Sequence, residues 1–84
     1  MKPTIVHELP TTSLTFQAHI IQARERLMSA GLSKTEATLD AELLLRKLAN
    51  LDKGTLLVRR HETAGPDLAT AYRKIIRRRE LREP

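Results

Sequence analysis

Apolar side chains recur at steps of three and four residues between positions 13 and 31, which is the spacing of one face of an α-helix. Ser13 or Thr12 is placed to cap the start of this helix. Gly31 is placed to end it, because glycine readily adopts the left-handed conformation. The apolar face comprises Phe16, Ile20, Ala23, Leu27 and Ala30, and it is widened by Ile21 and Met28.

A second helix is predicted to begin at the sequence SKTE. The Ser33 hydroxyl can accept a hydrogen bond from the backbone N–H of Glu36, and the Glu36 carboxylate can accept one from the N–H of Ser33, which makes a capping box. Leu39 and Leu43 flank the apolar face of this helix. Asp40 lies at its edge, where it either pairs or caps within the domain or contacts a partner. The predicted core positions are Ala37, Ala41, Leu44, Leu45 and Leu48.

The rest of the chain is predicted to carry one short and one longer helix. Asp52 can cap a helix of one or two turns that bears Leu56 and Leu57. Residues 65–67 form a turn into the last helix, which we expect Pro84 to end. Its apolar face comprises Leu68, Tyr72, Ile75 and Ile76, with Ala71 beside them. The patterns therefore predict an all-α fold, a small bundle of three amphipathic helices plus one or two short helices.

Length and composition restrict the classes of protein that fit. A chain of 84 residues forms at most one small domain. We expect residues 1–12, which contain Pro3 and Pro10 and show no period, to be a flexible lead before a helical domain at 13–84. We expect the amino terminus not to be a secretory signal. No apolar run approaches the roughly 20 residues that cross a bilayer. We therefore expect a cytoplasmic protein without membrane contact.

The residues typical of catalytic, cofactor and metal sites are absent or dispersed. There is no cysteine, and His7, His19 and His61 are too far apart for metal-ligand spacing. The three separated glycines make no phosphate-binding loop. No Ser/His/Asp set or carboxylate pair is apparent. We expect no catalytic, cofactor-binding or metal-binding residue in this chain.

The positive charge is concentrated near the carboxyl end. Residues 73–82 carry six basic groups and one acid, a net charge of +5 that equals the charge of the whole chain. Helical spacing directs four of these side chains away from the apolar face: Arg73, Lys74, Arg77 and Arg78. They form either a solvated helix end or a contact surface for an acidic partner. The two aromatic residues, Phe16 and Tyr72, offer no platform for stacking nucleic-acid bases.

The order of several short sequences resembles the amino-terminal domain of the HemK/PrmC family, the glutamine methyltransferases of peptide-chain release factors. The resemblance covers residues 14–84 and is carried by "AGL", by "DAELLL" at Asp40–Leu45, by "LDKGTLL" and by the final "REP". Asn50 stands where the family usually has glycine before "LD". Because asparagine also tolerates the left-handed conformation, we expect the helix to end there.

The resemblance implies a longer enzyme in which substrate recognition and catalysis belong to different domains. It implies that this bundle recognises the release factor and contacts the enzyme's own catalytic domain, which is Rossmann-like and binds S-adenosylmethionine. The Asn-Pro-Pro-Tyr motif of that domain does not occur here, so we expect an isolated domain or a truncated piece. The alternative is a free-standing basic helical module that binds nucleic acid. A single basic cluster without a recognition helix favours the first interpretation.

Overall fold

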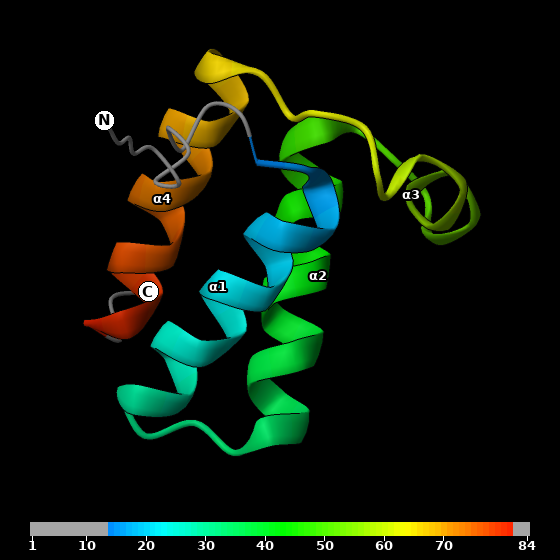
Figure 1. The fold of residues 1–84 in the computed structure, drawn as a ribbon. Helices are drawn as coiled ribbons and strands as arrows, with labels where there is room; N and C mark the ends of the chain where they lie inside the picture. The colour runs from blue at the N-terminus through cyan, green and yellow to red at the C-terminus, as the bar shows by residue number, and fades with distance from the viewer. Residues whose placement is uncertain (1–13, 82–84) are drawn as a thin grey trace, which may run out of the picture.

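The structure is a computed structural model that describes residues 14–81, and these residues form four α-helices (Figure 1). The helices are α1 (Phe16–Ser29), α2 (Lys34–Ala49), α3 (Lys53–Arg59) and α4 (Pro66–Glu80). The predicted all-α fold is confirmed. The expected flexible lead at residues 1–12 lies outside the described residues. Among those that are described, no helix is long and apolar enough to cross a membrane.

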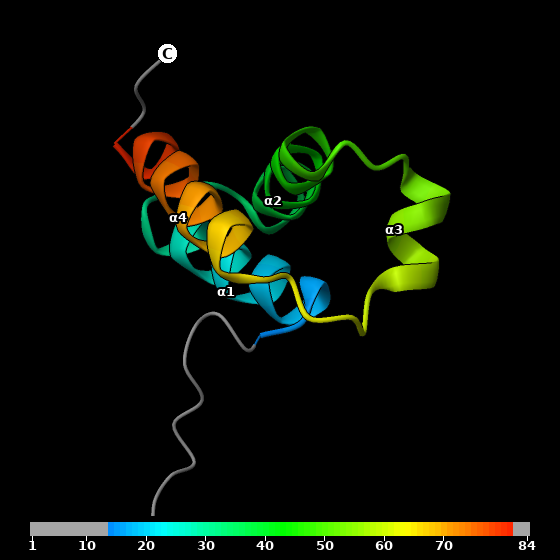
Figure 2. The same cartoon turned by 90° about the horizontal axis from the view of Figure 1, so that it is seen from above.

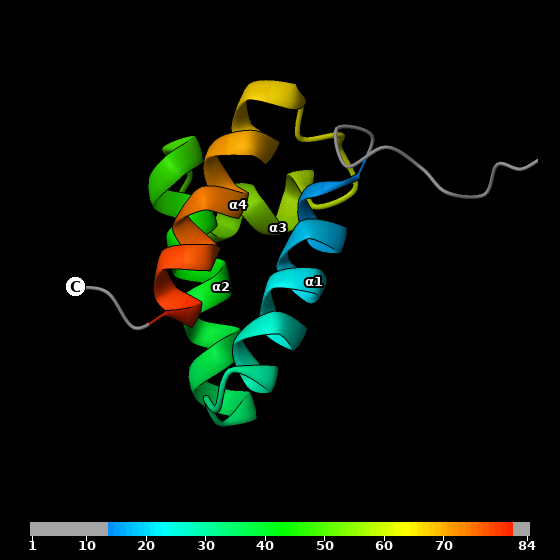
Figure 3. The same ribbon diagram turned by 90° about the vertical axis from the view of Figure 1, so that its left-hand side faces the viewer.

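Three of the helices form the bundle, and the short α3 lies to one side. α1 and α2 run antiparallel and are joined by a tight turn, and α4 packs against both (Figures 1 and 3). Seen from above, α3 stands apart from α4 and faces α1 and α2 across the molecule (Figure 2). The three amphipathic helices of the prediction are therefore α1, α2 and α4.

Helix α1 begins later than the sequence suggests. Its cap is Thr15, whose hydroxyl accepts a hydrogen bond from the backbone N–H of Ala18 at 3.1 Å, so the predicted cap at Ser13 or Thr12 is wrong. The reason lies in tertiary structure: the first backbone N–H groups of α1 donate to carbonyls of the segment that follows α3. Those bonds are 3.0 Å from residue 16 to residue 62 and 2.9 Å from residue 17 to residue 60. They satisfy donors that a helix start leaves free.

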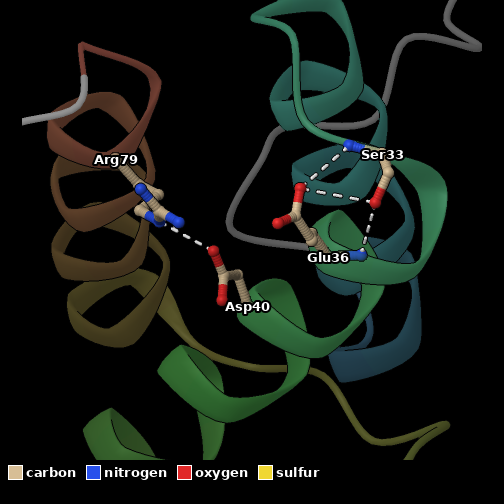
Figure 4. A network of polar contacts seen from close by, with 4 residues as sticks. All are labelled: Ser33, Glu36, Asp40 and Arg79. Carbon is tan, nitrogen blue, oxygen red and sulfur yellow. Dashed lines mark hydrogen bonds and ion pairs between the residues drawn. The ribbon is translucent and has the colours of Figure 1, made fainter.

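The termini of α2 follow its sequence. Glu36 N–H donates to the Ser33 hydroxyl at 3.1 Å, and Ser33 N–H donates to the Glu36 carboxylate at 3.3 Å, so the capping box is confirmed (Figure 4). At the other end Asn50 adopts the left-handed conformation with φ 58° and ψ 48°, as predicted. Gly31, with φ 112°, likewise follows α1 where the chain must turn. It lets Leu32 fold back and bury its side chain.

The core lies between α1, α2 and α4, and alanines on the facing surfaces allow close approach. Leu45 is completely buried, whereas Leu44 is half-buried and packs against the core. Leu39 and Leu43 are 63% and 44% exposed, in agreement with their place beside the apolar face. The buried hydrophobic residues of the core cluster are Phe16, Ala23, Leu27, Leu32, Ala37, Ala41, Leu45, Leu56, Tyr72 and Ile76.

Some expected core positions are wrong. Ile21 and Met28 are exposed rather than part of the α1 core face, since that face is centred on Ala23 and Leu27. Of the two leucines expected on the short helix, Leu56 is buried and Leu57 is exposed. Helix α4 ends at Glu80, before the proline that was expected to end it. The following Leu81 is exposed, and Pro84 lies outside the described residues.

Candidate partner-contact surface

The last turn of α4 is fastened to both neighbouring helices by ion pairs. Arg79 Nε donates to Asp40 Oδ2 on α2 at 2.7 Å (Figure 4). Arg26 on α1 makes a bidentate pair with Glu80, with distances of 2.7 and 2.9 Å. Bidentate pairs fix orientation as well as supplying energy. Asp40 therefore pairs inside the domain, which settles the alternative left open by the sequence.

Four basic side chains of α4 lie on its solvent-exposed face, away from these ion pairs. Arg73, Lys74, Arg77 and Arg78 are all exposed, as predicted. Of these, Lys74, Arg77 and Arg78 make no ion pair with any residue in the described range 14–81. We call these four residues the basic face. That it contacts a partner stays a prediction.

The position of the basic face follows from the buried side of the same helix. The Tyr72 hydroxyl donates to the carbonyl of Ala41 on α2 at 2.6 Å, and burial raises the pKa of Tyr72. The Tyr72 ring meets His19 of α1 edge to face, with 6.1 Å between ring centroids. These contacts fix the rotation of α4 about its axis. The basic side chains are therefore presented on a rigid element.

Helix electrostatics make the basic face tolerable without a partner. Like charges at i and i+4, such as Arg73 with Arg77 and Lys74 with Arg78, destabilise a helix by about 0.2–0.5 kcal/mol per pair. The partial negative charge at the carboxyl end of the helix stabilises nearby cations by about 0.3–1 kcal/mol. The two effects nearly cancel. The basic face can therefore persist as an exposed cationic patch without any partner.

Sequence reasoning missed two features. His19 is buried, and its place one turn before Ala23 could have indicated this if polar residues had been counted in the stripe. A groove between α3 and the bundle was also not predicted, because it depends on how α3 is placed. Within residues 14–81 no three metal-ligand side chains gather.

Comparison with known proteins identifies the family. The family model described as the PrmC N-terminal domain matches residues 19–84. No curated protein and no solved structure matches the chain. The matched region contains α2, α3 and α4 completely and most of α1. It also includes both ion pairs and the whole basic face. The chain therefore belongs to the PrmC N-terminal domain family, as its resemblance to HemK/PrmC predicts.

Proposed function

We propose that this chain is the substrate-recognition domain of a protein glutamine methyltransferase that acts on peptide-chain release factors in the cytoplasm. The support is membership of the PrmC N-terminal domain family. Methyl transfer would take place in a separate domain that binds S-adenosylmethionine, joined to this one in the full-length enzyme. The contribution of the present chain is to bind and orient the protein substrate.

The observation that carries the contact surface is the basic face of α4. Its four cations project from a helix whose last turn is held at two points, by Arg26 with Glu80 and by Arg79 with Asp40. A fixed patch of one charge attracts an oppositely charged protein and raises the rate of encounter. We propose that it attracts an acidic surface of the release factor and that the full-length enzyme's catalytic domain lies elsewhere on this bundle.

Charge reversal tests the proposal in the full-length enzyme. The Arg77→Glu/Arg78→Glu variant should lower kcat/KM for release-factor methylation, mainly through KM, and it should weaken the dependence of kcat/KM on salt. The matched control is Lys34→Glu/Lys47→Glu, which makes the same change of charge at exposed positions on α2. An unchanged kcat/KM in the α4 variant at both low and moderate salt would show that the basic face is only a solvated helix end.

The same cationic surface also supports the second candidate, a module that binds nucleic acid. Phosphate contacts make such binding strongly dependent on salt. The nucleic-acid interpretation predicts that the isolated domain binds duplex RNA or DNA and that Arg77→Glu/Arg78→Glu abolishes the binding. Release-factor binding that persists in excess duplex would contradict it.

A further inference from the structure

An apolar groove runs between α3 and the bundle, on a different part of the molecule from the basic face. We call it the α3 groove. Its apolar lining comes from Ile20 and Ile21 of α1 and from Leu56 and Leu57 of α3. Leu56 is buried and anchors α3, whereas Leu57 is 61% exposed. Figure 2 shows α3 facing α1 and α2 at this position. Exposed apolar side chains on a preformed concave surface are typical of a protein contact site.

The volume of the α3 groove fits a protein side chain better than a cofactor. The groove is open to solvent and has a volume of about 270 Å³. Pockets that bind drug-sized ligands usually have volumes of about 300–1,000 Å³, and an apolar cavity of about 150 Å³ holds benzene. One or two large aliphatic or aromatic side chains would therefore fill it.

The position of α3 is fixed although it packs little against the other helices. The Arg59 guanidinium lies 5.6 Å from the centre of the Phe16 ring on α1, and Arg59 also pairs with Glu62 at 2.8 Å. The backbone bonds between the start of α1 and residues 60–62 hold the end of α3 from the other side. The groove is therefore built into the fold, and binding would not have to order it first.

The polar lining of the α3 groove is cationic. Arg24, Lys53 and Arg60 line it with one acid, Glu42, which gives three positive charges against one and a net charge of +2. None of these four residues makes an ion pair with the part of the chain that the structure describes. The groove is therefore complementary to a segment that carries carboxylates beside its apolar side chains.

Two residues that line the α3 groove each have a buried polar atom without a partner. Gln17 Oε1 and Arg24 Nε are buried, and neither has a hydrogen-bond partner within residues 14–81. Both residues line the groove. A buried polar group that is left unpaired typically costs about 1–3 kcal/mol, so such atoms are usually satisfied in the functional state. A carboxylate that enters the groove is attracted by the positive charge of Arg24, which lines it.

We propose that the α3 groove binds an acidic amphipathic segment of the protein substrate, with one large apolar side chain between the α1 and α3 leucines and isoleucines and a carboxylate against Arg24. This inference rests on the proposed function, because it takes the release factor as the occupant. It adds a second, apolar contact to the electrostatic contact of the basic face. The basic face would then mainly accelerate encounter, while the groove would slow dissociation.

Two matched pairs of variants of the 84-residue domain test the proposal. The quantity measured is the affinity of each variant for a peptide-chain release factor. Leu57→Ser removes an apolar side chain from the groove, and Val58→Ser is its control. Val58 is the next residue of α3, is 84% exposed and is not part of the groove lining. Lys53→Glu reverses a charge at the groove, and Lys34→Glu is its control, since each lysine is the first residue of its helix.

The expected result is a Kd at least about fivefold higher for Leu57→Ser and for Lys53→Glu, with both controls close to the parent. Thermal midpoints close to the parent's would show that the variants are folded. Amide resonances of the ¹⁵N-labelled domain should shift around Ile21 and Leu57 when the release factor is added.

The alternative results separate the two proposals. If the release factor binds the parent and all four single variants equally, the groove inference is overturned while the proposed function stands. If it does not bind the parent at all, the proposed function fails and the groove inference fails with it. Groove resonances that shift with the concentration of the domain alone would assign the groove to contact between two copies. Groove resonances already shifted in the full-length enzyme would assign it to the catalytic domain. Either of these last results overturns the inference.

Discussion

Replacing Leu45 with alanine should destabilise the domain far more than the same change at Leu39. Both residues lie on α2 and both substitutions remove three carbon atoms, but Leu45 is 0% exposed and Leu39 is 63% exposed. Leu44 is half-buried and should give an intermediate result. Because both substitutions replace leucine with alanine in the same helix, the change in helix propensity is the same, and the difference in stability reports burial.

The magnitude follows from transfer and cavity energies. Three buried carbon atoms at about 0.8 kcal/mol each give about 2.4 kcal/mol, and the cavity that is left raises the cost of Leu45→Ala to about 3–5 kcal/mol. At Leu39 little more than a third of the side chain is covered, so the loss is below about 1 kcal/mol. A domain of this size has about 4–13 kcal/mol of stability in total. Leu45→Ala therefore removes a large share of it.

Urea denaturation and thermal melting followed by circular dichroism measure both variants. For a domain of 60–100 residues each kcal/mol shifts the midpoint by about 4–8 °C, so Leu45→Ala should lower Tm by more than about 10 °C. Leu39→Ala should lower it by only a few degrees. If the two variants were equally destabilised, α2 would not be oriented as the structure shows, and its leucines would not divide into core and surface positions.

Two further changes test the contacts that hold α3 and α4. Tyr72→Phe keeps the ring but removes the hydrogen bond to the Ala41 carbonyl, so urea denaturation should show a loss of about 0.5–1.5 kcal/mol; no loss would mean that the hydroxyl contributes nothing. Asp52 caps α3, and its hydrogen bonds from Thr55 hold its pKa below the usual value. A carboxyl group whose pKa is lower in the folded than in the unfolded protein stabilises the fold when it is ionised, at pH values above its unfolded pKa. The parent should therefore have a higher Tm than Asp52→Ala, and this difference should be full above about pH 4 and should shrink as the pH falls further. An advantage that is constant down to pH 2 would contradict this.

Local signals in the sequence predicted the ends of α2 well. The capping box at Ser33 and the left-handed stop at Asn50 each depend on residues no more than a turn apart, so the necessary information is contiguous. The start of α1 could not be predicted in this way. Its first N–H groups are satisfied by carbonyls about 45 residues later in the chain, at Glu62 and Arg60. Those contacts exist only once α3 has been placed.

In the candidate site, too, local sequence predicts some features, and others depend on contacts between distant segments. Exposure of the basic face was predictable because helical spacing alone directs Arg77 and Arg78 away from Tyr72. The partners of Asp40 and Glu80 were not predictable, since each ion pair joins two helices far apart in the sequence. The α3 groove requires the position of α3 relative to α1, which no periodic pattern encodes.

Direct binding of a peptide-chain release factor to this 84-residue domain tests the central claim most closely. Isothermal titration calorimetry at low and at moderate salt should show saturable 1:1 binding that weakens as salt rises. Arg77→Glu/Arg78→Glu should bind more weakly than the parent at low salt and respond less to salt, and Lys34→Glu/Lys47→Glu should bind as the parent does. A folded parent domain that gives no binding at low salt would contradict the claim that this member of the PrmC N-terminal domain family recognises the release factor.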